Sequence, residues 1–65
     1  MSNLKRIREE KNISQAKLAE ESGVSLRMIQ HYEQGFKDIN KAQGITLHNI
    51  AQALECKIED LLETT

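Results

Sequence analysis

Apolar residues recur at helical spacing in several segments of the chain, separated by short polar stretches. In the first segment, Leu4 and Ile7 lie one helical turn apart. The side chain of Asn3, just before them, can accept a hydrogen bond from a free amide of the first turn. We therefore expect a first helix that is capped by Asn3 and ends near Asn12.

The second and third segments form a pair of short helices joined at Gly23. Ser14 is expected to cap the second helix, in which Leu18 faces inward. A glycine just past the last turn can adopt the left-handed conformation that ends a helix at low cost. Ser25 then caps a third helix, which is expected to end at Gly35.

The third helix has one apolar side and one polar side. Ile29 and Tyr32 share the inward side, with Met28 beside them. The opposite side presents four polar residues, with Leu26 at its leading edge: Arg27, Gln30, His31 and Gln34.

The apolar pattern lapses after the third helix and then returns over a fourth. Its apolar residues are Ile45, Leu47, Ile50, Ala51 and Leu54. This helix runs to Glu55, but its start is open between Asn40 and Thr46, because Gly44 would cost about 1 kcal/mol in a helix interior. A last short helix is expected over Ile58, Leu61 and Leu62.

The composition favours one all-α domain. The chain has 65 residues, 38% of them apolar, and a chain of this length has room for one core. Aromatic residues make up 3% and proline is absent, which suits short helices packed through aliphatic side chains. No run alternates apolar and polar residues with β-branched enrichment, the usual signature of a strand. We therefore predict a single compact five-helix domain over residues 1–65.

Charge is distributed unevenly along the chain, although the formal net charge is only −1. Residues 1–41 hold eight Lys and Arg against six Asp and Glu, whereas residues 42–65 hold one against four. Positive charge therefore lies on the half that contains the paired helices.

Little in the sequence points to catalysis or metal binding. One Cys and two separated His residues do not give the ligand spacing of a zinc site, and no Gly-rich phosphate loop is present. We expect Cys56 to be a buried small hydrophobic residue and His48 to lie on the surface. The chain also has no run of about 18 apolar residues that would cross a membrane. These features predict a cytoplasmic protein that is not an enzyme and has no cofactor, metal or small-molecule ligand.

Two helices joined by a turn of three to four residues, the second with a polar face, have the geometry that lets a helix enter the DNA major groove. The sequence resembles the helix-turn-helix repressors of the phage Cro and repressor type, also called the xenobiotic-response-element family. Nine residues at fixed spacing carry this resemblance: Gln15, Leu18, Ala19, Gly23, Val24, Ser25, Ile29, Glu33 and Gly35. The stretch "LKRIREEKNIS" is similar to the family's first helix and "LHNIAQALECKIEDLLE" to its last two.

The resemblance implies a lambda-repressor-like fold that binds double-stranded DNA and regulates transcription, with repression expected. The residues that it places against DNA are Gln15, Ser25, Leu26, Arg27, Gln30, His31, Lys37, Asn40 and Lys41. Four of them, at positions 26, 27, 30 and 31, would point into the major groove, where Arg pairs with guanine, Gln with adenine, and an aliphatic tip packs on a thymine methyl. The others would contact phosphates.

The resemblance also implies a buried ion pair between Arg8 and Glu33, which would tie the first helix to the third. In the same comparison, Glu55 stands where the family usually has a helix-ending glycine. An alternative function stays open, in which the chain keeps this fold but binds another protein, as an antitoxin-like or anti-repressor partner.

One recognition helix reads only a few base pairs, so we expect a homodimer on a palindromic operator, with two helices one turn of DNA apart. The candidates for its interface are the apolar residues Leu61, Leu62 and Phe36. The sequence leaves the operator, the regulated genes and any inducer open.

Overall fold

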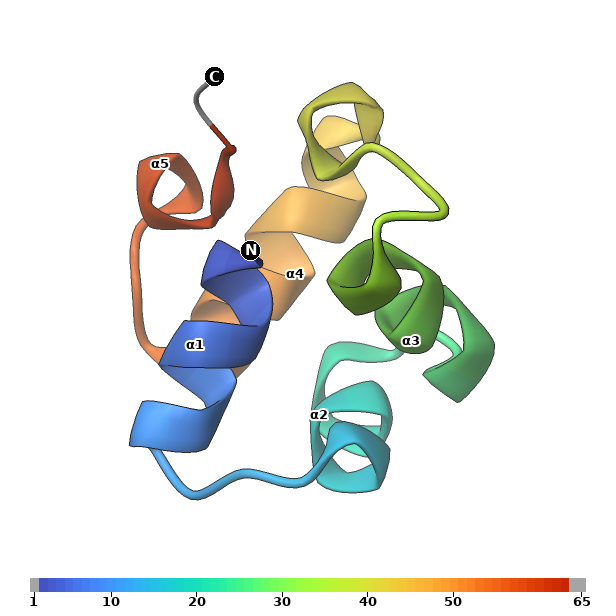
Figure 1. The fold of residues 1–65 in the computed structure, drawn as a ribbon. Coiled ribbons are helices and arrows are strands. Elements are labelled where there is room, and N and C mark those ends of the chain that lie inside the picture. Colours follow the sequence, from blue (N-terminus) through green and yellow to red (C-terminus); the bar gives the residue numbers. More distant parts are fainter. Residues whose placement is uncertain (1, 64–65) are drawn as a thin grey trace.

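The computed structural model describes residues 2–63, which form five α-helices and one short 3-10 turn (Figure 1). In chain order they are α1 (Asn3–Glu10), α2 (Gln15–Ser22), α3 (Leu26–Gln34), the turn η1 (Ile39–Lys41), α4 (Gly44–Leu54) and α5 (Ile58–Leu61). These residues contain no strand. The prediction of an all-α, five-helix fold is therefore confirmed.

Serine hydroxyls cap the first three helices. Ser2, Ser14 and Ser25 each accept a hydrogen bond from the amide three residues later, at 3.0, 3.0 and 3.1 Å. The predicted caps at Ser14 and Ser25 are confirmed, but the predicted cap at Asn3 is wrong. Asn3 is the first residue of α1, and its side-chain amide donates instead to the carbonyl oxygen of Leu62 at 2.8 Å.

Left-handed residues mark where the helices end. Gly23 and Gly35 have φ angles of 73° and 84°, as the sequence predicts. Asn12 (φ 58°) ends the turn after α1, and Glu55 (φ 55°) ends α4. After α1, α3 and α4 the following amide reaches back five residues, as in Phe36 N–H to the carbonyl oxygen of His31 at 2.9 Å. This Schellman arrangement satisfies carbonyl groups that the helix leaves free.

The fourth helix begins at Gly44, closer to the later of the two predicted starts. Gln43 is its N-cap residue but makes no side-chain cap hydrogen bond. Asn40 belongs to η1, which Asp38 caps by accepting from the Asn40 amide at 2.9 Å. Gly44 therefore lies in the first turn of a helix, where its flexibility matters less than in the interior.

The core is aliphatic apart from Tyr32, and all five helices contribute to it. The largest fully buried side chains are Leu4, Leu18, Ile29, Ile50, Leu54 and Leu61. Each such side chain contributes roughly 1.5 to 3 kcal/mol through its removal from water. Because Leu61 is fully buried, its predicted role at a dimer interface is wrong.

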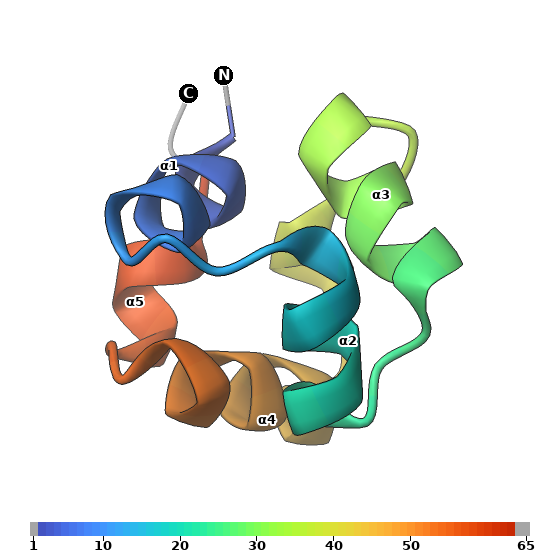
Figure 2. The same cartoon turned by 90° about the horizontal axis from the view of Figure 1, so that it is seen from below.

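The helices are arranged so that α3 lies at the edge of the molecule (Figure 1, Figure 2). The helix α2 packs against α3 and α4, while α5 packs against α1 and α4. The helix α3 packs against α2 and α1, and Leu26, Arg27 and Gln34 on it are exposed. Among residues 2–63 no helix is long and apolar enough to span a membrane.

Candidate nucleic-acid interface

The outer side of α3 is polar and accessible. Ile29 and Tyr32 are buried on its inner side, at 0% and 9% exposure. On the outer side, Arg27 is exposed and Gln30 and His31 are half-buried. No ion pair within residues 2–63 involves Arg27, so its guanidinium is available to a ligand. The structure thus brings the predicted base-reading residues onto one open face.

Leu26 begins this face, and its side chain is 41% exposed. The residue before it is Ser25, whose hydroxyl oxygen accepts a hydrogen bond from the Met28 amide. An exposed leucine beside arginine and glutamine offers the apolar contact that a thymine methyl group requires.

A buried ion pair fixes α3 to α1. The Nε atom of Arg8 lies 2.7 Å from Oε2 of Glu33, and its Nη2 atom lies 3.1 Å from Oε1. The two side chains are only 11% and 2% exposed. Hydrogen bonding to Glu33 raises the pKa of the Arg8 guanidinium above its ordinary value, so Arg8 stays charged at any physiological pH.

Arg8 and Glu33 also hold the start of α2. The Nη1 atom of Arg8 donates to the carbonyl oxygen of Ile13 at 2.8 Å, and the Ile13 amide donates to the carbonyl oxygen of Arg8 at 3.1 Å. Gln15 Nε2 donates to Oε1 of Glu33 at 2.9 Å. The sequence predicts the ion pair through the family resemblance but gives no sign of the bond to Gln15, because 18 positions separate the two residues.

His31 makes an aromatic contact that sequence reasoning missed. Its ring centroid lies 5.8 Å from that of Phe36, in an edge-to-face arrangement with an interplanar angle of 75°. The Schellman turn at Gly35 reverses the direction of the chain, so that Phe36 lies beside the end of α3. The Phe36 side chain is nevertheless 73% exposed.

The connection between α3 and α4 supplies two exposed lysines. Lys37 and Lys41 line one shallow hollow beside Tyr32 and the start of α4. Within residues 2–63 neither lysine takes part in an ion pair. The first amides of α4 add partial positive charge nearby, since no side chain caps them.

Asn40, the third predicted contact in the connection, is engaged elsewhere. Its Nδ2 atom donates to the carbonyl oxygen of Glu63 at 2.6 Å, and its Oδ1 atom accepts from the Glu63 amide at 2.8 Å. The Glu63 carboxylate in turn accepts from the Asn3 amide at 3.1 Å. Asn40 therefore fastens the segment after α5 to the connection.

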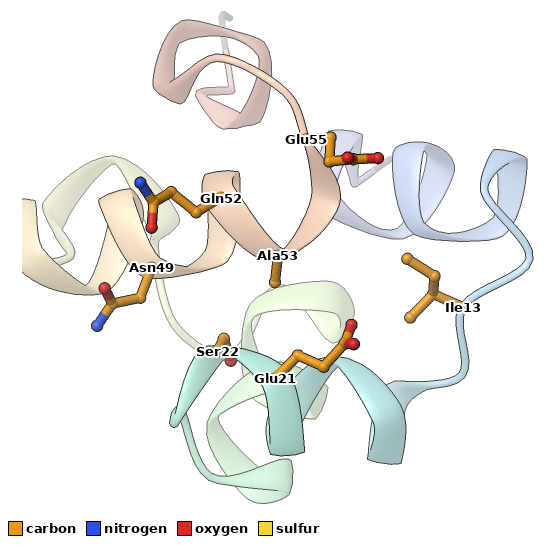
Figure 3. Close-up of a pocket in the computed structure, with 7 residues that line it drawn as sticks. All are labelled: Ile13, Glu21, Ser22, Asn49, Gln52, Ala53 and Glu55. Atoms are coloured by element: carbon orange, nitrogen blue, oxygen red, sulfur yellow. The ribbon is translucent and has the colours of Figure 1, made fainter.

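A further groove lies on a different side of the molecule, between α2 and α4 (Figure 3). Ala53 points from α4 toward α2, whose Glu21 and Ser22 form the facing side. The residues that line the groove are Ile13, Glu21, Ser22, Asn49, Gln52, Ala53 and Glu55, and none of them is a predicted DNA contact. The groove is therefore separate from the α3 face.

Cys56 and the histidines form no metal site in the part of the chain that the structure describes. Cys56 is only partly buried, and desolvation, with a smaller contribution from Asp60, raises the pKa of its thiol. A thiol with a raised pKa is a poor nucleophile near neutral pH. His48 is exposed on α4, as the sequence predicts.

The paired helices α2 and α3, with the open polar face of α3, define a helix-turn-helix protein. A family model described as helix-turn-helix matches residues 4–61. The chain therefore belongs to the helix-turn-helix family of the Cro and phage-repressor type, and this membership places it among the DNA-binding regulators. No curated protein matches the sequence.

Proposed function

We propose that this protein is a sequence-specific, double-stranded DNA-binding transcriptional regulator, acting as a repressor, that reads the major groove with α3. The observation that carries the proposal is the outer face of α3, where Arg27 has no ionic partner among residues 2–63. Its residue types match base chemistry: Arg27 with guanine, Gln30 with adenine and Leu26 with a thymine methyl. His31, held beside Phe36, lies one turn after Arg27 on the same face.

Two groups of residues are proposed to contact phosphates beside this face. One group is Gln15 and the first amides of α2, and the other is Lys37 and Lys41, which line the hollow beside Tyr32. Ser25 is also proposed to reach a phosphate through its hydroxyl. Asn40 keeps one Nδ2 hydrogen for such a contact, since its other hydrogen-bonding groups engage Glu63.

The protein is proposed to act as a homodimer on a palindromic operator. Phe36 and Ile45 are the large apolar side chains that the structure leaves most exposed, at 73% and 61%. Leu62 is partly covered by the core. Phe36 is therefore the best of the interface candidates that the sequence offered.

The same exposed apolar side chains are the observation that favours the alternative, a module of this fold that binds another protein. The two functions differ in their dependence on salt. A protein that neutralises phosphates loses DNA affinity steeply as salt rises, because binding releases counterions.

Selection of bound duplexes from a random pool tests the proposal. We expect enrichment of a site with two related halves whose centres lie roughly 34 Å apart, one turn of DNA. Binding to that site should weaken steeply with added salt, and Arg27→Ala should relax the selected preference at one base pair of each half-site. If the wild-type protein enriches no sequence at low salt, the proposed function is wrong.

A further inference from the structure

We propose that Glu33 is a positioning residue for DNA binding. It holds the side-chain amide of Gln15 so that Nε2 donates one hydrogen to Glu33 and presents the other to a DNA phosphate. This inference rests on the proposed function and deepens it, because it assigns a core carboxylate to the placement of one phosphate contact.

The geometry begins with the carboxylate, whose side chain is 2% exposed. Its Oε2 atom accepts from Arg8 Nε at 2.7 Å, and its Oε1 atom accepts from Arg8 Nη2 at 3.1 Å and from Gln15 Nε2 at 2.9 Å. Arg8 also holds Ile13, two residues before Gln15, through its Nη1 atom at 2.8 Å. Both the backbone and the side chain at the start of α2 are thus tied to one ion pair.

The bond to Glu33 decides which way the Gln15 amide faces. An ionised carboxylate only accepts hydrogen bonds, so it selects the Nε2 end of the amide and turns the Oε1 end away. An amide nitrogen carries two hydrogens, and the second is free to meet another acceptor. Phosphate oxygens accept in the same way, so Nε2 can bridge the two anionic groups.

Gln15 lies beside the proposed base-reading face. Glu33 follows Gln30 by three residues on α3, and residues three apart are neighbours on a helix surface. Gln15 is half-buried, so part of its side chain reaches solvent at this edge. A phosphate bound there would fix the register of α3 in the groove.

The functional gain is preorganisation. A free glutamine side chain loses rotamer freedom when it binds a phosphate, whereas one already held by a buried carboxylate loses less. In a folded Glu33→Gln variant, Gln15 would remain at the start of α2 but would no longer be held by a carboxylate, and the phosphate contact would weaken.

A double-mutant cycle on the selected duplex tests this coupling. Gln15→Ala and Glu33→Gln are each expected to weaken binding about tenfold, the loss typical of a hydrogen bond to a charged group. The double variant should be no weaker than Gln15→Ala alone, because without the Gln15 amide there is no phosphate contact left for residue 33 to position. All titrations are made at a temperature where circular dichroism shows each variant folded.

Glu20→Gln is the matched control. It makes the same change in net charge as Glu33→Gln, but Glu20 is 75% exposed on α2. Removing a negative charge should by itself leave DNA affinity equal or slightly higher. A loss of affinity in Glu33→Gln and none in Glu20→Gln would therefore support positioning.

Phosphate ethylation interference distinguishes positioning from a general loss of structure. We expect Gln15→Ala and Glu33→Gln to lose sensitivity at the same phosphate in each half-site, with all other positions retained. Loss at different phosphates, or additive losses in the double variant, would overturn the inference.

A measurement on the wild-type protein decides the matter if Glu33→Gln does not fold. In the nuclear magnetic resonance spectrum of the free protein, the Gln15 side-chain amide should occupy one rotamer, with a hydrogen protected from exchange. Averaging over several rotamers would overturn the inference while leaving the proposed function intact. If wild-type protein selects no duplex, the proposed function fails and this inference fails with it.

Discussion

Glu55 ends α4 in a left-handed conformation, with a φ angle of 55°, that glutamate adopts only at a cost. For a residue with a Cβ atom this conformation costs roughly 1 to 2 kcal/mol. Glycine avoids that cost. It also makes the unfolded chain more flexible, however, which lowers the free energy of unfolding by about 0.4 to 1 kcal/mol. We expect Glu55→Gly to raise the free energy of unfolding by about 0.5 to 1 kcal/mol, measured by urea denaturation.

Glu55→Ala is the control for this substitution. It removes the same side-chain charge but keeps a Cβ atom, so it should give no comparable gain. Equal stabilisation by alanine and glycine would mean that the carboxylate, and not the backbone conformation, is unfavourable at this position.

For single residues, the sequence predicts backbone features such as helix caps better than it predicts the hydrogen-bond partners of side chains. The caps at Ser14 and Ser25 follow from residue type and position, because a cap depends on a few neighbouring residues. The bonds of Gln15 to Glu33 and of Asn3 to Leu62 could not be predicted, since they join residues 18 and 59 positions apart. Ser2, not Asn3, caps α1, and Asn3 is the first residue of the helix.

At the scale of elements, Asn40 joins the connection before α4 to the segment after α5. Its amide makes two hydrogen bonds to the backbone of Glu63, at 2.6 and 2.8 Å. We expect Asn40→Ala to lower the free energy of unfolding by about 1 to 2 kcal/mol, because net contributions of single hydrogen bonds are of this order. The amide of Glu63 should also exchange faster with solvent.

Lys41→Ala serves as the comparison, since Lys41 is exposed on the same turn and its side chain has no ionic partner among residues 2–63. Its stability should stay within about 0.5 kcal/mol of the wild type. If Asn40→Ala changes the free energy of unfolding as little as Lys41→Ala, and hydrogen exchange at the Glu63 amide is unchanged, the hydrogen bonds between Asn40 and Glu63 do not form in solution.

The boundaries of α4 show where sequence patterns stop being sufficient. The apolar residues predict the helix itself, but they do not say which of several polar residues begins it. The structure starts α4 at Gly44, after an N-cap residue whose side chain makes no cap hydrogen bond. Without a Ser, Thr, Asp or Asn cap, the sequence carries no local signal for the start.

At the scale of the whole molecule, the Arg8–Glu33 pair holds three helices together. Removing one partner of a buried pair costs about 3 to 5 kcal/mol, because the other charge is left without compensation. A domain of this size is expected to have only about 3 to 10 kcal/mol of total stability. We therefore expect Glu33→Ala to be largely or partly unfolded at 37 °C, as measured by thermal denaturation.

Glu20→Ala is the control, since its ion pair with Lys17 is exposed and such pairs contribute about 0 to 1 kcal/mol. An unchanged melting temperature for Glu33→Ala would show that the buried pair does not stabilise the fold.

The overall architecture was predictable because it depends on a pattern that all five helices repeat. Apolar residues at helical spacing specify which side of each helix is buried, and one chain of this size can form only one core. The outer face of α3 was predictable for the same reason, as the complement of Ile29 and Tyr32. The contact between Gln15 and Glu33, which supports this face, could not be predicted, because it depends on how the helices pack against one another.

The second whole-molecule expectation concerns assembly on DNA. Two protomers should bind one duplex that carries two half-sites, because each α3 reads only a few base pairs. Sedimentation of the saturated complex measures the stoichiometry. Phe36→Ala should reduce the cooperativity of binding between the two protomers. Ile45→Ala is the parallel variant at the second exposed apolar residue, which is 61% exposed. One protomer per duplex at saturation would contradict the homodimer.

The central claim is that α3 reads base sequence, and titration of Arg27→Ala tests it most directly. The selected duplex, its single-base variants and a scrambled duplex are titrated with wild type, Arg27→Ala and Lys41→Ala at several salt concentrations. Arg27→Ala should lose about 1 to 3 kcal/mol on the selected duplex and relax the preference at one base pair per half-site. Lys41→Ala should weaken all duplexes alike and make the logarithmic salt dependence shallower by roughly one unit per protomer. If Arg27→Ala weakens every duplex equally and keeps all base preferences, α3 does not read bases through Arg27 and the account is contradicted.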